Sequence, residues 1–105
     1  MALIVTDGNI DEILVKNQIT VLDFWAEWCG PCRMLGPIIE TLSAEEINNG
    51  ITIGKVDVDA NNASATRFGV RNIPTVIFLK DGEVVDKMVG VSSKDALQAK
   101  IDSLK

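Results

Sequence analysis

The feature that most constrains this chain is a pair of cysteines placed where an apolar run gives way to helical spacing. Val21–Ala26 is apolar except for Asp23, which is typical of a strand buried on both faces within a parallel sheet. A Cys-Gly-Pro-Cys tetrapeptide at 29–32 follows, and the apolar residues beyond it recur at helical intervals. The pair is therefore predicted to lie at a strand-to-helix junction. Unpaired amide groups and the helix dipole favour negative charge there, so we expect Cys29 to ionise more easily than a free thiol.

Length and charge narrow the classes of function. The 105 residues suit one domain spanning 1–105. The net charge is −5 and the 10 Lys and Arg residues are scattered, which leaves no basic stripe for a nucleic-acid backbone. No apolar run approaches the length of a membrane span, and the first nine residues lack the features of a signal peptide. We therefore expect a cytoplasmic protein that binds neither nucleic acid nor membrane.

The spacing of apolar residues predicts that strands and helices alternate along the chain. The expected strands are Leu3–Val5, Ile19–Ala26, Ile51–Val58, Thr75–Leu79 and Glu83–Val89. The expected helices are Ile10–Lys16 (closed by Asn17 and Gln18), Cys29–Ile47, Ala63–Phe68, and a last helix that follows a capping sequence at Ser92–Asp95 and runs to about Leu104.

This order predicts an α/β fold. Helices join the first three strands, so these strands should be parallel. Asp81-Gly82 is a strong hairpin signal and should join the last two strands as an antiparallel pair. The result is a mixed five-stranded sheet with four helices on its two faces.

The longest predicted helix contains two prolines, one at a position that tolerates proline and one at a position that does not. Pro31 suits the first turn, which needs no N–H donor, whereas Pro37 lies inside the pattern and should kink the helix. The sequence Asn-Asn-Gly at 48–50 should end it. One side of this helix carries the apolar residues Leu35, Ile38, Ile39, Leu42 and Ile47.

Three interpretations of the cysteine pair can be compared. A structural zinc site needs four ligands, and this chain offers two cysteines and no histidine. Two small buried residues three positions apart would be a coincidence at such a junction. A reversible disulfide is the interpretation that the context favours. In that chemistry the Cys29 thiolate attacks a target disulfide, and Cys32, one turn further in and expected to be more buried, attacks the Cys29 sulfur and releases the reduced target.

Asp23 and Lys55 are the further candidates for proton chemistry. Apolar neighbours surround Asp23 in the sequence, so we expect burial to raise its pKa and allow proton exchange with Cys32. Lys55 could modulate that charge from the neighbouring strand, or its stem could extend to solvent. Trp25 is expected to pack in the core, whereas Trp28 should border a substrate surface. From the residues alone, Pro74 marks either a strand start or a cis bond.

Together, Asp23, the WCGPC motif at 28–32 and the Ile-Pro pair at 73–74 closely resemble the thioredoxin family, and the likeness extends over the whole chain. The resemblance implies that Cys29 attacks, Cys32 resolves, Asp23 is the buried acid and Lys55 its charged neighbour. It also implies that Pro74 is cis and faces the cysteines. The apolar docking surface would consist of Trp28, Gly30, Pro31, Ile73, Gly90 and Val91.

The resemblance also implies partners. A flavin-containing reductase that uses NADPH, or a ferredoxin-dependent one, would return electrons to a monomer that holds no cofactor or metal of its own and acts on protein disulfides. Pro31 occupies the place where a histidine would stabilise the thiolate and make the protein a stronger oxidant, so we expect a reductant. The alternatives are a non-enzymatic binding subunit with the same fold and, more remotely, metal delivery by paired chains.

Overall fold

The computed structural model describes residues 2–15 and 18–105. Its strands are β1 (Leu3–Ile4), β2 (Ile19–Trp25), β3 (Thr52–Asp57), β4 (Thr75–Lys80) and β5 (Glu83–Val89). Its helices are α1 (Ile10–Ile13), α2 (Gly30–Ala44), the 3₁₀ turn η1 (Glu46–Asn48), α3 (Asn62–Arg67) and α4 (Lys94–Leu104).

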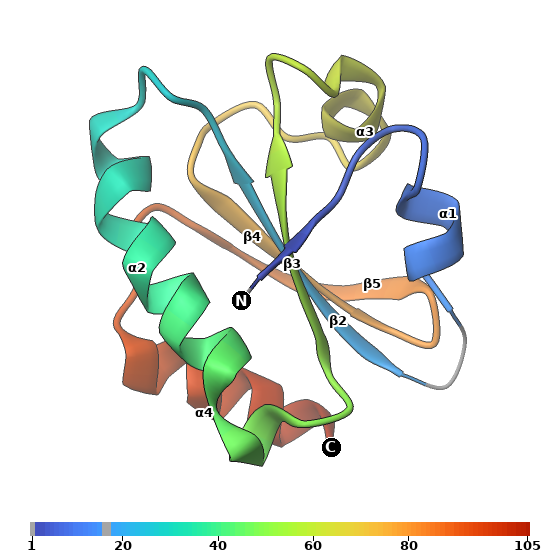
Figure 1. The fold of residues 1–105 in the computed structure, drawn as a ribbon, viewed down its shortest axis with the longest axis vertical. Helices are drawn as coiled ribbons and strands as arrows, with labels where there is room; N and C mark the ends of the chain where they lie inside the picture. The colour runs from blue at the N-terminus through green and yellow to red at the C-terminus, as the bar shows by residue number, and fades with distance from the viewer. Residues whose placement is uncertain (1, 16–17) are drawn as a thin grey trace.

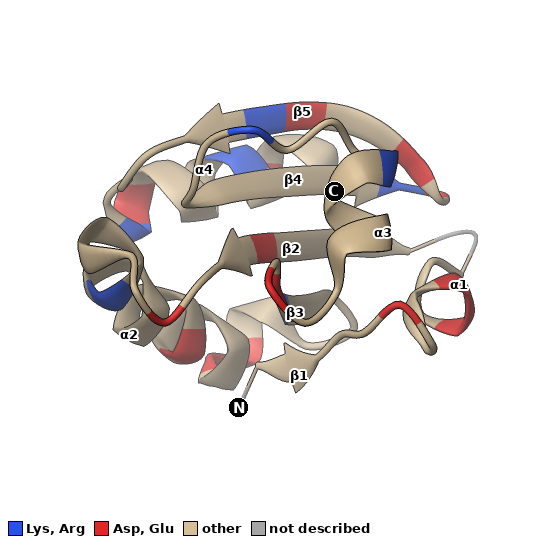
Figure 2. Ribbon diagram, turned by 90° about the horizontal axis from the view of Figure 1, so that it is seen from above, with Lys and Arg blue, Asp and Glu red and all other residues tan. Residues whose placement is uncertain are grey.

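The five strands form one mixed sheet in the order β1-β3-β2-β4-β5, which confirms the predicted fold class (Figures 1 and 2). β3 pairs in parallel with β1 and with β2, while β4 pairs antiparallel with β2 and with β5. The β4–β5 turn has positive φ at both Asp81 (54°) and Gly82 (83°), as a two-residue type I′ hairpin requires. The sheet therefore places β2, which leads to the cysteines, at its centre.

Two apolar clusters lie on opposite faces of the sheet. Leu35 and Ile39 of α2 pack with Leu97 and Ile101 of α4 against one face. Ile10 of α1, Ala65 of α3 and Phe68, which directly follows α3, belong to the cluster on the other face. β2 is buried on both sides, so its one acidic residue, Asp23, is enclosed. Figure 2 shows this residue as the acidic band within β2, because Asp23 is the only acid of Ile19–Trp25.

The prediction that the longest helix extends to Ile47 is wrong. α2 continues through Pro37 but ends at Ala44, and Glu45 leaves it with an extended backbone. The helical periodicity stops there, so the side chain of Ile47 lies in η1 and is 57% exposed. Asn48 is buried instead, because its amide donates to the Leu42 carbonyl oxygen at 2.9 Å and closes the last turn of α2.

Two smaller predictions also need correction. α1 ends at Ile13 rather than at Lys16, and the predicted end at Lys16 and Asn17 lies outside the described residues. The cap of α4 is Ser93, whose hydroxyl accepts from the Ala96 N–H at 3.1 Å. The predicted capping sequence is thus shifted by one residue, and a methyl group stands where a reciprocating carboxylate would be.

Candidate active site

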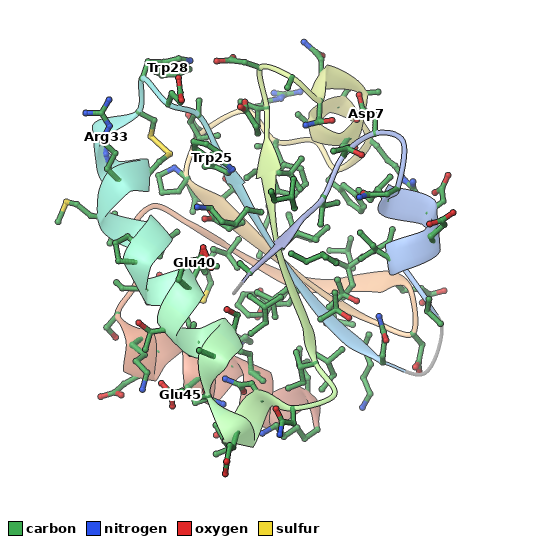
Figure 3. The ribbon with its side chains drawn as sticks, in the orientation of Figure 1. Asp7, Trp25, Trp28, Arg33, Glu40 and Glu45 are labelled. Atoms are coloured by element: carbon green, nitrogen blue, oxygen red, sulfur yellow. A yellow bond between two sulfur atoms is a disulfide. The ribbon has the colours of Figure 1, made fainter. Side chains whose placement is uncertain are left out.

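Cys29 and Cys32 form a disulfide at the start of α2 (Figure 3). Cys29 is the residue that caps the helix, with φ −89° and ψ 110°, and its sulfur accepts from the Cys32 N–H at 3.2 Å. Pro31 occupies the first turn, where its missing N–H leaves no helical hydrogen bond unmade. The Cys32 amide that donates to the Cys29 sulfur in the disulfide would also stabilise a Cys29 thiolate after reduction.

Both cysteines are buried, and to nearly the same extent, with 5% of Cys29 and 4% of Cys32 exposed. The expectation that Cys32 is the more buried of the two is therefore not supported by the disulfide form. What distinguishes them is their surroundings. The Cys29 sulfur lies 3.8 Å from the carbonyl oxygen of Ile73, whereas Cys32 lines a pocket on the side of β3.

The peptide bond between Ile73 and Pro74 is cis, as the resemblance implied. Pro74 directly precedes β4, so the two interpretations left open from the residues both apply. The Gly90 N–H donates to the Pro74 carbonyl oxygen at 2.8 Å, which brings the segment after β5 beside the segment before β4. Ile73 and Gly90 therefore belong to adjoining segments at the cysteine end of the sheet.

Asp23 lies in the middle of β2 and is 1% exposed. Neither of its carboxylate oxygens accepts a hydrogen bond from the described residues. Burial raises the pKa of Asp23 from 3.8 to about 7, and the positive charge of Lys55 opposes that rise. The predicted direction and cause are confirmed, and the carboxyl group changes charge near neutral pH.

Lys55 is the direct partner of Asp23 in the β2–β3 register. Its Nζ lies 4.9 Å from the centre of the Trp25 ring, a cation–π contact. Lys55 forms no ion pair with a carboxylate within the described part of the chain. Trp25 is half-buried and packs against the cysteines, in agreement with the expected packing role.

Trp28 is exposed but held in place. Its side chain is 69% exposed, and its Nε1 donates to Asp59 Oδ2 at 2.8 Å. Asp59 follows β3 and was not singled out from the sequence, because no local pattern links it to a residue 31 positions away. The remaining predicted docking residues Gly30, Pro31 and Val91 are also exposed.

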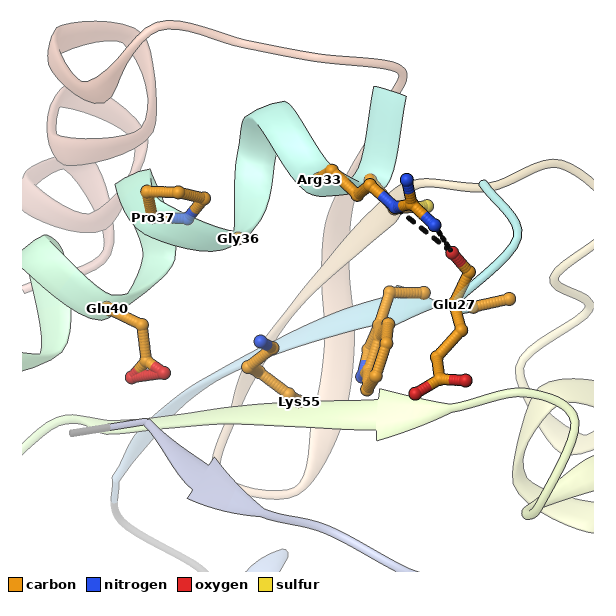
Figure 4. A pocket seen from close by; sticks show the side chains of 9 residues that line it. Glu27, Arg33, Gly36, Pro37, Glu40 and Lys55 are labelled. Carbon is orange, nitrogen blue, oxygen red and sulfur yellow. Dashed lines mark hydrogen bonds between the residues drawn. The ribbon is translucent and has the colours of Figure 1, made fainter. Parts of the chain in front are cut away.

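Arg33 is a second residue that sequence analysis missed. Its Nε and Nη2 donate to the carbonyl oxygen of Glu27 at 3.2 and 2.9 Å (Figure 4). This double contact braces the loop that carries Trp28 and Cys29 against the first turn of α2. A partner that is a backbone carbonyl leaves no trace in the sequence, so the brace could be found only in the structure.

A pocket of about 610 Å³ opens beside Cys32, between α2 and β3. Its walls include the Trp25 ring, Arg33, Glu40 and Lys55 (Figure 4). Within the described ranges, no group of three or more His, Cys, Asp or Glu side chains could hold a metal ion. None of the described helices is long and apolar enough to cross a membrane.

Comparisons with known proteins agree with this geometry. The thioredoxin family model matches residues 1–103. Thioredoxin 2 of Chlorobaculum tepidum is 46% identical over 98 residues (92% of this chain and 89% of the relative), and thioredoxin of Staphylococcus haemolyticus is 46% identical over 103 residues (97% of each). The solved structure of Malassezia sympodialis thioredoxin matches with a TM-score of 0.90 at 33% identity, covering 99% of this chain and 90% of that one. The chain belongs to the thioredoxin family of protein disulfide oxidoreductases.

Proposed function

We propose that this chain is a general protein disulfide reductase in which Cys29 is the attacking thiol and Cys32 the resolving thiol. The observation that carries the proposal is the position of Cys29 as the cap of α2, where its sulfur already accepts an amide hydrogen bond. A sulfur at that position is stabilised as a thiolate, and the thiolate is the nucleophile in thiol–disulfide exchange.

The exchange proceeds in two steps. The Cys29 thiolate attacks one sulfur of a target disulfide; a mixed disulfide forms, and the other target sulfur leaves as a thiolate that takes up a proton. Cys32 then loses its proton and attacks the Cys29 sulfur, which re-forms the Cys29–Cys32 disulfide and releases the second target thiolate. The target gains two electrons and two protons, and the chain is oxidised by the same amount.

Asp23 is the proposed acceptor of the Cys32 proton. A general base works best when its pKa lies near the operating pH, and burial raises the pKa of Asp23 to about 7. The Lys55 charge favours the ionised form and so limits that rise. We assign Lys55 the role of tuning Asp23 rather than of contacting the substrate.

The proposed docking surface consists of Trp28, Gly30, Pro31, Ile73, Pro74, Gly90 and Val91. Gly90 and Pro74 are joined by a backbone hydrogen bond, and the Ile73 carbonyl lies beside Cys29. The backbone of Ile73 would pair with an extended segment of the target, which sets a disulfide against the Cys29 sulfur.

Members of this family act on protein disulfides and are reduced by thioredoxin reductase. We further propose that the chain works as a cytoplasmic monomer and that its reductase is a flavoprotein using NADPH or a ferredoxin-dependent enzyme. Turnover of insulin disulfides with each reductase in turn distinguishes the two sources of electrons. A reduction potential near that of an oxidising isomerase would contradict the proposed direction of electron flow.

A trapping experiment tests the roles of the cysteines. The Cys32→Ser variant should accumulate a covalent complex with a protein disulfide, because nothing resolves the mixed disulfide. The Cys29→Ser variant is the matched control and should give no complex. A complex trapped by Cys29→Ser alone would reverse the assignment.

A further inference from the structure

The Lys55 ammonium has a well-defined place beneath α2. It lies over the Trp25 ring, and a Cβ atom built on Gly36 would be 3.8 Å from Nζ. The ammonium thus lies at the level of Gly36, in the pocket that Cys32 also lines (Figure 4).

Glu40 lies one turn further along the same side of α2. Residues four apart share a face of a helix, so Glu40 follows Gly36 over the pocket. Its carboxylate is fixed, because Oε1 accepts from the Ala2 N–H at 2.5 Å. Figure 4 shows the Glu40 and Lys55 side chains pointing into the same pocket, and both also line an adjoining hollow of about 410 Å³.

Lys55 therefore has two carboxylates of different character near it. Asp23 is its cross-strand partner and is enclosed, whereas Glu40 lines the open pocket and is anchored. We infer that Glu40 is a positioning residue for Lys55, which it draws toward the open pocket and away from Asp23. The consequence for catalysis rests on the proposed role of Asp23, but the placement of Glu40 and Lys55 in one pocket does not.

Other charged groups line the pocket or the adjoining hollow. Arg33 is bound to the Glu27 carbonyl at the mouth of the pocket. Asp57, two residues beyond Lys55 on β3, lines only the adjoining hollow, and its Oδ1 accepts from the Asp59 N–H at 2.9 Å. Glu27 lines the pocket from the loop before Cys29, and Cys32, which is in the disulfide, lines it from α2. Glu40 is the anchored carboxylate on the face of α2 that covers Lys55.

The test is a titration of Asp23 by NMR in the oxidised protein. Glu40→Gln keeps an oxygen that can accept from the Ala2 N–H and removes only the charge, so Lys55 becomes free to favour the Asp23 carboxylate. The pKa of Asp23 should fall by roughly 0.5 or more. Glu46→Gln makes the same change in net charge on exposed η1 and should leave the titration unchanged.

A double-mutant cycle separates an effect through Lys55 from direct repulsion between the two carboxylates. In a Lys55→Met background, Glu40→Gln should lower the pKa of Asp23 by less than half as much as in the parent chain. An unchanged titration in the single variant, or an undiminished fall in the Lys55→Met background, would overturn the inference.

Kinetics distinguish the inference from the proposed proton transfer. If Asp23 accepts the Cys32 proton, the pH profile of disulfide reduction should move with the Asp23 titration in Glu40→Gln. A titration that moves while the rate profile stays in place would uphold the role of Glu40 and remove Asp23 from the reaction.

Discussion

Asp23 and Lys55 face each other directly across β2 and β3, yet the carboxylate of Asp23 accepts no hydrogen bond from the described residues. A strand centre would normally be filled by an apolar side chain, and an unpartnered acid there disfavours the folded state whenever it is ionised. The pair thus places a titratable group inside the core and keeps a cation close enough to limit the cost.

The first prediction concerns stability and pH. Because the pKa of Asp23 is raised from 3.8 to about 7, the folded state binds this proton more tightly than the unfolded state. The resulting stabilisation is complete below about pH 3.8 and is lost as the pH rises through 7. The free energy of unfolding of the Asp23→Asn variant should therefore exceed that of the parent chain by up to about 4 kcal/mol at pH 8, and by far less at pH 4.

Urea denaturation of the oxidised protein at pH 4 and pH 8 measures this difference. Glu46→Gln, on the exposed η1 turn, is the control and should follow the parent chain at both values. A gain for Asp23→Asn that is the same at both pH values would mean that better packing, not the lost ionisation, stabilises the variant.

The second prediction isolates the charge of Lys55. Lys55→Met keeps an unbranched stem against Trp25 but removes the ammonium that lowers the pKa of Asp23. The pKa of Asp23 should rise from its value of about 7 in the parent chain. NMR titration of the carboxyl group measures this change. If the titration curve stays where it is, the ammonium is too well solvated to act on Asp23.

The third prediction concerns the exposed indole of Trp28. Asp59→Ala removes the acceptor of its Nε1 hydrogen bond and frees the ring. The KM for a protein disulfide should rise about fivefold, as expected for one lost hydrogen bond, with kcat less affected. Asp59→Asn retains an acceptor oxygen and should restore most of the affinity. Equal KM values for both variants and the parent chain would show that the orientation of Trp28 does not matter for docking.

The fourth prediction concerns the close approach of β1 to β3. A Cβ atom on Gly54 would lie 2.5 Å from Val5 Cγ2 and 3.1 Å from the Leu3 carbonyl oxygen. Gly54→Ala should therefore destabilise the fold by about 1–3 kcal/mol in urea denaturation. Gly30→Ala is the matched control, since nothing lies within 4 Å of its Cβ position and helix propensity favours alanine. Loss of stability in the control alone would contradict the argument from space.

The sheet and the cysteine pair could be predicted because their signals are local. A buried run, a Cys-Gly-Pro-Cys sequence and a helical repeat adjoin one another, and Asp81-Gly82 specifies its own hairpin. Ile47 could not be placed, because its apolar character continued the helical pattern beyond the point at which the backbone leaves α2 at Glu45.

The parts of the site that escaped prediction are contacts between distant residues or with the backbone. The hydrogen bond from Trp28 to Asp59 and the Arg33 brace on Glu27 depend on how strands and loops are placed in space. Lys55 was a candidate from its place on the neighbouring predicted strand and from the resemblance to the family. Its place opposite Asp23, in a pocket that Glu40 also lines, follows from the pairing of β2 with β3 and from the position of α2.

The disulfide joins residues only three apart in the chain, both at one end of α2. A cross-link that closes so small a loop restricts the unfolded chain far less than one that spans a domain. We therefore expect the two apolar clusters on either side of the sheet to sustain the architecture in both oxidation states. The cysteine pair can then be oxidised and reduced repeatedly while the rest of the fold stays in place.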